Sequence, residues 1–126
     1  MNKYADLMGR ILISVMFILS GFGKIMHSDV ALGYMHSMGV PSLLLPVVIA
    51  TEVLGGLAIL IGFKTRIAAF LLAGFCILSA LIFHFNFADQ AQSINFMKNL
   101  AIAGGFLFLV ANGPGPLSMD RKWGNA

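Results

Sequence analysis

Residues 41–63 read PSLLLPVVIATEVLGGLAILIGF, and this stretch decides the fold class. At about 1.5 Å per residue, an α-helix of this length spans roughly 34 Å, which is enough to cross the hydrocarbon core of a bilayer. Its only charged residue is Glu52, which stands eleven residues from Pro41 and eleven from Phe63. The stretch therefore predicts a membrane-spanning helix with an acid near the midplane, about 16 Å from either face.

The composition of the whole chain indicates the same environment. The 126 residues are 59% hydrophobic and 10% charged, and the mean hydropathy is +0.91. Because a soluble domain is about a quarter charged, this composition excludes soluble globular, disordered and coiled-coil proteins. The formal net charge is +3, but the Lys and Arg residues are dispersed and form no basic face, so nucleic acid is not an expected partner.

Three further stretches are long and apolar enough to cross a bilayer, at about residues 7–26, 67–88 and 94–111. Together with residues 41–63 they predict an all-α integral membrane four-helix bundle that occupies residues 1–126 as one domain. A cleaved signal peptide is the alternative for the first stretch. Its apolar run is long, however, and no A-x-A motif follows it.

The connections between the spans define the remaining elements. Residues 29–38 carry apolar side chains on one side and predict a short interfacial helix between the first two spans. Residues 64–66 alone join the second and third spans, which indicates a tight antiparallel hairpin. The tail, residues 117–126, is polar enough to be exposed to water, and we interpret its Asp120 as a capping or tail-anchoring group.

The distribution of Lys and Arg predicts the orientation, because cytoplasmic loops retain these residues. With four crossings, both termini and the turn at residues 64–66 lie on one side. That side carries six of the eight cations, and the opposite side carries Lys24 and Lys98. We therefore expect both termini in the cytoplasm.

Helix contacts in lipid depend on small residues, because apolar burial alone gives little net drive for association. The last three spans each carry such residues, which we predict to be the packing positions: Gly55, Gly56 and Gly62; Ala69, Ala73, Cys76 and Ala80; and Ala101, Gly104 and Gly105. Cys76 is the only cysteine, which excludes an internal disulfide and a CxxC redox pair.

Glu52 needs a partner, because an ionisable group at membrane depth costs about 2.5 to 3.5 kcal/mol on insertion scales. Ranked by depth, Lys98 is the first candidate, with an axial gap to Glu52 of about 8 Å. Arg10 approaches from the other side across a larger gap but offers a stronger carboxylate clamp. Lys24 lies near the outer end of its span, where extension toward the lipid headgroups is the simpler interpretation.

Combining depth with helix face predicts a polar pocket in the outer half of the bundle. The pocket is expected to be roofed by the interfacial helix with Tyr34, and the candidate ligand-binding residues in and near it are Glu52, His84, Lys98, Asn99, Lys24 and Arg10. The competing interpretation is structural: Glu52 takes part in an ion pair between helices, Lys24 and Arg10 extend toward headgroups, and His84 is a wetted side chain near the interface. No catalytic residue is assigned.

Several cofactors do not fit the residue types present. A bis-histidine haem needs two histidines at matching depth, and only His84 lies within a span. A closed zinc or copper site lacks ligands, so no haem or metal is expected. No Walker or Rossmann glycine loop is present, which argues against a nucleotide.

The motifs together resemble the DoxX family, and most closely its YqjF-like branch of bacterial inner-membrane proteins. The resemblance covers nearly the whole chain and is carried by Arg10, by SGFGK at residues 20–24, by EVLGG at residues 52–56, by KNL at residues 98–100 and by GPG at residues 113–115. It implies a four-helix protein of the bacterial inner (cytoplasmic) membrane. Relatives that gave the family its name are small subunits of a thiosulfate:quinone oxidoreductase or terminal quinol oxidase. A family resemblance alone does not define an activity.

Three functions remain open at this point. The leading hypothesis is an accessory subunit of a membrane redox system that binds a quinone or similar hydrophobic cofactor, with redox proteins as partners, because the pocket residues offer donors for two carbonyls. The second is a non-enzymatic scaffold or assembly factor in which the buried charges hold helices together. The third is an oligomeric small-solute transporter, since one four-helix bundle is narrow and a homo-oligomer would be needed.

Overall fold

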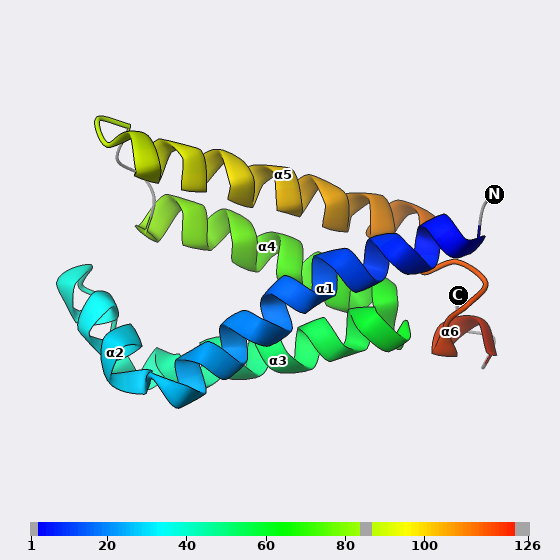
Figure 1. Cartoon of the computed structure of the whole chain (residues 1–126), viewed down its shortest axis with the longest axis horizontal. Coiled ribbons are helices and arrows are strands. Elements are labelled where there is room, and N and C mark those ends of the chain that lie inside the picture. The colour runs from blue at the N-terminus through cyan, green and yellow to red at the C-terminus, as the bar shows by residue number, and fades with distance from the viewer. Residues whose placement is uncertain (1–2, 84–86, 123–126) are drawn as a thin grey trace.

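The computed structural model describes residues 3–83 and 87–122 and is helical throughout its regular structure. Four helices in it are long and apolar enough to cross a membrane, which confirms the predicted all-α membrane bundle. The elements in chain order are α1 (Lys3–Met26), α2 (Ser28–Ser37), the short 3-10 helix η1 (Ser42–Leu44), α3 (Leu45–Ile61), α4 (Thr65–Phe83), α5 (Gln90–Asn112) and α6 (Met119–Lys122) (Figure 1).

The helix boundaries differ most from the prediction around the connection between α4 and α5. The stretch predicted to run to residue 88 is helical to Phe83, and Phe87 and Ala88 lie in a turn. Helix α5 begins at Gln90 because the Asp89 carboxylate accepts a 2.9 Å hydrogen bond from the amide of Ala91 and caps the first turn. Apolar continuity alone did not reveal this capping signal.

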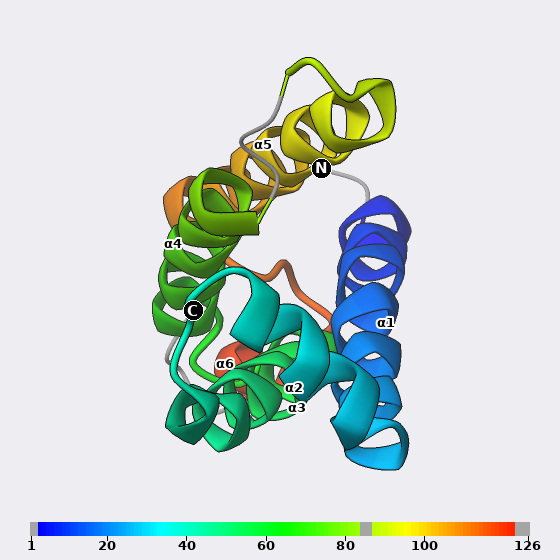
Figure 2. The same cartoon turned by 90° about the vertical axis from the view of Figure 1, so that its left-hand side faces the viewer.

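The long helices associate as two pairs, α1 with α3 and α4 with α5, and the α3–α4 hairpin connects the pairs (Figures 1 and 2). Close approach within the first pair depends on glycines. A Cβ on Gly21 would collide with the Val53 side chain, and a Cβ on Gly56 would lie 2.8 Å from the Ile18 side chain. The backbones of α1 and α3 can approach this closely only because both positions lack a side chain.

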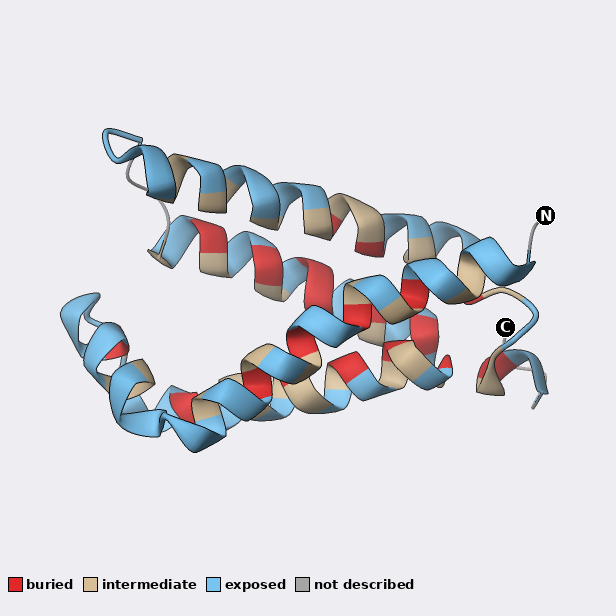
Figure 3. Cartoon of the chain, in the orientation of Figure 1, coloured by how far each residue is buried: buried red, intermediate tan, exposed pale blue. Residues whose placement is uncertain are grey.

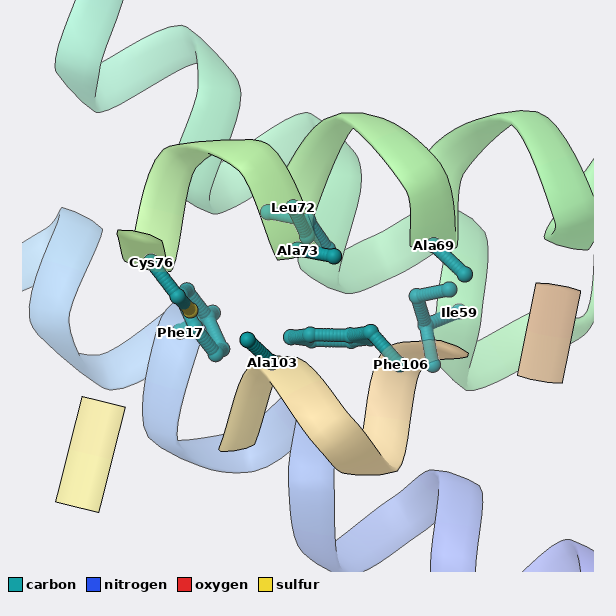
Figure 4. Packing of buried hydrophobic residues seen from close by; sticks show 8 residues of the cluster. All are labelled: Phe17, Ile59, Ala69, Leu72, Ala73, Cys76, Ala103 and Phe106. Atoms are coloured by element: carbon teal, nitrogen blue, oxygen red, sulfur yellow. The ribbon is translucent and has the colours of Figure 1, made fainter. Parts of the chain in front are cut away.

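The apolar core lies where α1 passes the second pair (Figures 3 and 4). Its buried members are Phe17, Ile59, Ala69, Leu72, Ala73, Cys76, Ala103 and Phe106. The rings of Phe17 and Phe106 meet edge to face with centroids 5.4 Å apart. The small-residue stripe predicted on the third span is therefore confirmed as the packing face of α4.

The packing positions predicted for the fourth span are only partly right. Gly105 faces Ile13 of α1, but nothing lies within 4 Å of a Cβ built on Gly104. The buried residues of α5 are Ala103 and Phe106 instead. The prediction used residue size, whereas α5 directs an aromatic ring into the core and leaves Gly104 outside it.

The tail after α5 returns to the α3–α4 turn and is anchored there by Asp120, while Leu117, Arg121 and Lys122 are exposed, as expected for a tail in contact with water. Asp120 is 2% exposed, and its carboxylate accepts hydrogen bonds from the amides of Lys64 (2.6 Å) and Thr65 (2.7 Å). The Asp120 amide donates to the Gly62 carbonyl at 2.8 Å. Asp120 thus caps the start of α4 from a distant part of the chain, as expected for an anchoring group.

The α1–α3 contact predicts a difference between two glycines of the same helix. Gly21→Leu should lower the free energy of unfolding by about 2 kcal/mol, because the new side chain must displace Val53. Gly23→Leu is the matched control, since nothing lies within 4 Å of its Cβ position. Denaturation in detergent followed by circular dichroism measures both, and equal losses would contradict the packing described above.

The docked tail predicts a pH dependence. Burial alone would raise the pKa of Asp120, but amide hydrogen bonds from Thr65 and Lys64 and the Lys64 charge lower this pKa overall. Since the folded pKa lies below the unfolded one, the stabilisation is present above about pH 4 and is lost as the pH falls through the folded pKa.

Hydrogen exchange at the amides of Lys64 and Thr65 measures this effect. Asp120→Asn should lower their protection at pH 7 by about tenfold and remove its acid dependence. Asp89→Asn, which alters the cap of α5 instead, is the control and should leave these two amides protected. Unchanged protection in Asp120→Asn would show that the carboxylate does not hold the tail.

Candidate functional site

The most prominent polar group inside the bundle is a cluster of three side chains, which we call the polar triad: Glu52, Lys24 and Ser20. Lys24 Nζ lies 2.9 Å from Glu52 Oε1 and donates to Ser20 Oγ at 2.9 Å. Ser20 Oγ in turn donates to Glu52 Oε2 at 2.9 Å. Glu52 is 4% exposed, so its carboxylate is held almost entirely by protein contacts.

Local sequence explains how the triad forms. Ser20 and Lys24 are four residues apart and therefore lie on one face of α1. Gly21 on the same helix contacts α3 at Val53, next to Glu52, and a Cβ built on it would lie 3.4 Å from the Glu52 Cβ. The glycine thus brings the two helix backbones close enough for short hydrogen bonds between their side chains.

The triad forms one wall of a cavity of about 410 Å³. Helix α2 contributes Tyr34 and Met35 to the lining, so the predicted roof is present. The Tyr34 hydroxyl donates to the Phe83 carbonyl at 3.1 Å, and its ring stacks on the Phe83 ring, which ties α2 to the end of α4. Most other lining side chains are apolar, among them Phe17, Val48, Phe75, Leu78 and Ile82.

The structure corrects the predicted partner of Glu52. Lys98 ranked first by depth, but it is exposed and does not line the cavity, whereas Lys24 makes the ion pair. The ranking by depth along the helix axis did not take into account the direction in which each helix face points. Asn99, one residue further along α5, does line the cavity, and its side chain donates to the Asn95 carbonyl at 3.3 Å.

Arg10 lies at the other end of α1 and does not contact Glu52. Its Nη1 donates to the carbonyls of Ile59 (3.2 Å) and Leu60 (3.0 Å), and its Nη2 donates to the carbonyl of Leu117. The guanidinium therefore satisfies the last turn of α3 and holds the tail. Arg10 is 1% exposed, so the interpretation that it extends toward headgroups is wrong.

His84 and Ser20 differ from the predicted set of site residues in different ways. His84 lies outside the described residues. Ser20 was missed as a site residue, although its position four residues before Lys24, opposite a buried acid, was the available signal. Among residues 3–83 and 87–122, no three His, Cys, Asp or Glu side chains gather closely enough to hold a metal ion.

Comparison with known proteins places the chain in a family. The DoxX family model matches residues 5–85. The chain is 51% identical to the inner membrane protein YqjF of Escherichia coli (strain K12) over 130 residues, which cover 98% of this chain and all of the relative. It is 39% identical to the inner membrane protein YphA of the same organism over 123 residues, which cover 92% of this chain and 88% of that relative. No solved structure matches.

These similarities and the four apolar helices show that the chain is a small helical membrane protein. Within that class, the chain belongs to the DoxX family. The matched region contains all of α1 except its first two residues and the whole of α2, α3 and α4, and therefore the whole polar triad.

The geometry of the triad predicts unequal effects of removing its two charges. Lys24→Met should lower the free energy of unfolding by about 2 kcal/mol, because it leaves the Glu52 carboxylate without a cation at membrane depth. The double variant Lys24→Met/Glu52→Gln should recover part of that loss. Lys98→Met is the control and should change stability by less than about 0.5 kcal/mol. A larger loss in Lys98→Met than in Lys24→Met would contradict the pairing.

Proposed function

We propose that this protein binds a quinone or a similar neutral hydrophobic cofactor in the triad cavity, as an accessory subunit of a membrane redox system. The observation that carries the proposal is an apolar cavity of about 410 Å³ with one polar wall. Ligand sites in proteins combine these features, namely a mostly apolar lining and a few converging polar groups.

The charge of the polar wall supports an uncharged headgroup. Lys24 and Glu52 form an ion pair, so they bring no net charge to the cavity when both are ionised. A carboxylate or phosphate headgroup would gain no net Coulombic attraction there and would lose its hydration. A quinone ring carries carbonyls that can accept hydrogen bonds, and the third N–H of Lys24 and the amide of Asn99 are donors of the required type.

The apolar lining supports a ring with a hydrocarbon tail. Phe17 and Phe75 are in edge-to-face contact with ring centroids 6.5 Å apart, and both line the cavity. Flat ligands pack well against such rings. The redox chemistry itself would belong to the bound cofactor and to redox proteins that share it.

The same triad gives a reason to keep the scaffold alternative. It links α1 to α3 through two side-chain contacts to Glu52, so its main role would then be to lock these helices together. In that case Glu52→Gln would reduce folding or complex recovery without changing any ligand. Assembly into a homo-oligomer and small-solute transport remain weaker alternatives, which flux into proteoliposomes would reveal.

For location, we propose the inner membrane, as the names of the two relatives suggest, with both termini in the cytoplasm. Six cations at the end that carries the termini, against Lys24 and Lys98 at the other, support this orientation. Fusing a reporter that is active only in the cytoplasm to the C-terminus tests it. An inactive reporter on a stably produced fusion would reverse the assignment.

Ligand binding is tested on purified protein in mild detergent. Small molecules that copurify are identified by mass spectrometry, and binding of a short-chain benzoquinone is titrated by spectroscopy. We expect saturable binding, weakened about tenfold or more in Glu52→Ala, because loss of the carboxylate releases Lys24 and Ser20 from the cavity wall. Thr51→Val is the matched control, since the Thr51 hydroxyl bonds only to the Val47 carbonyl of its own helix.

Two results would contradict the proposal. The first is a purified protein without any bound quinone and without saturable binding. The second is equal binding by wild type and Glu52→Ala when both are folded. A stability loss in Glu52→Ala without any change in ligand would favour the scaffold alternative.

A further inference from the structure

A second hollow lies at the end of the bundle that carries the termini, between α1 and α5. It is a groove of about 330 Å³ lined by α1, by α5 and by Gly113. These two helices belong to different pairs, and each packs mainly on its own partner. The groove is separate from the triad cavity, because the two share no lining residue.

One side of the groove offers hydrogen-bond acceptors. Asp6 lies in the first turn of α1 and is half-buried. Within the described part of the chain, its carboxylate accepts no hydrogen bond and makes no ion pair. Asn112, the last residue of α5, donates its amide nitrogen to the Phe108 carbonyl at 3.0 Å, which leaves its side-chain oxygen as an acceptor. This side therefore suits a ligand group that donates several hydrogen bonds.

Arg66 does not line the groove but lies next to it, against Gly113. Arg66 Nη1 donates hydrogen bonds to the carbonyls of Val110 (3.1 Å) and Ala111 (3.2 Å) and thereby caps the end of α5. Its Nη2 and Nε lie 3.1 and 3.4 Å from the position of a Cβ on Gly113, a residue that lines the groove. This edge of an exposed guanidinium is the one that binds two oxygens of a phosphate.

Arg10 is the cation among the residues that line the groove. It is 1% exposed, and its Nε has no hydrogen-bond acceptor among the described residues. Because Nε is buried, Arg10 would act on a ligand in the groove through its charge rather than through a hydrogen bond.

The depth of the groove matches the headgroup level of a bilayer. Asp6 comes from the first turn of α1 and Asn112 from the last turn of α5. The apolar lining residues Ile13, Phe108 and Leu109 lie further along the same helices, toward the middle of the membrane. A molecule with a polar head and hydrocarbon chains could therefore lie with its head between Asp6 and Arg66 and its chains against Phe108.

We propose that this groove binds a phospholipid whose headgroup carries both a phosphate and a primary ammonium. The ammonium would donate to Asp6 and Asn112, and the phosphate would accept from Arg66, with Arg10 adding positive charge beneath it. A quaternary ammonium has no N–H to donate to Asp6, and an anionic headgroup without an ammonium would leave the Asp6 carboxylate without a donor. The two charges of the lipid thus match Asp6 in the groove and Arg66 beside it.

The test uses the full chain, delipidated in mild detergent. Phosphatidylethanolamine, phosphatidylcholine and phosphatidylglycerol with the same acyl chains are added, and native mass spectrometry and the midpoint of thermal unfolding are followed. We expect one tightly held phosphatidylethanolamine per chain, with half-maximal stabilisation at an about tenfold lower concentration than for the other two lipids.

Three variants separate the groove from general lipid effects. Asp6→Asn should abolish the preference for phosphatidylethanolamine. Gly9→Leu should weaken binding of this lipid by filling the groove, because Gly9 lines the groove and nothing lies within 4 Å of its Cβ position. Gly23→Leu, in the same helix but outside the groove, should behave as wild type.

Equal stabilisation by all three lipids would overturn the proposal. So would a preference for phosphatidylglycerol, which would show recognition of negative charge alone. A preference that survives in both Asp6→Asn and Gly9→Leu would place the lipid elsewhere. None of these outcomes depends on whether the triad cavity binds a cofactor.

Discussion

An ionisable group buried among membrane helices must find its partner inside the protein, because the surrounding hydrocarbon offers none. Helix α1 meets this constraint for both ends of the bundle. Near one end its Arg10 donates hydrogen bonds to carbonyls in the last turn of α3. Near the other end its Lys24 and Ser20 bind the Glu52 carboxylate. The α1–α3 pair is thus fastened at two levels, and Gly21 and Gly56 allow the close approach between them.

The pairing of helices also determines where the hollows lie. Because α1 packs on α3 and α5 packs on α4, the spaces between the two pairs are incompletely filled at both ends. At one end α2 roofs the space, and this becomes the triad cavity. At the other end the space between α1 and α5 stays open as the groove beside Asp6. Both hollows join a polar wall to apolar side chains, as sites for amphiphilic molecules do.

Arginines close the helix ends in both pairs. Arg10 satisfies carbonyls at the end of α3, and Arg66 does the same at the end of α5. Each guanidinium spans two carbonyls, which a single lysine ammonium would do with less geometric fit. These two arginines therefore have structural roles, whereas Lys24 and Glu52 of the triad line the larger cavity.

Much of the architecture was readable from the chain, because hydropathy over about 20 residues reports directly on the bilayer. The four spans, the helix at residues 28–37, the packing stripe of α4 and the anchoring role of Asp120 all follow from local pattern. The boundary near Phe83 was harder to predict, since apolar residues continue beyond the end of the helix.

The sequence by itself determined that Glu52 lies at membrane depth, and it predicted a basic neighbour because an ionised carboxylate in a long apolar run is costly without one. Tertiary structure alone decided that the neighbour is Lys24, together with Ser20. It also decided that Lys98 is exposed and that Arg10 donates to carbonyls at the end of α3 instead. The physical reason is that depth along a helix follows from residue number, whereas the rotation of each helix about its axis depends on how all the faces pack together.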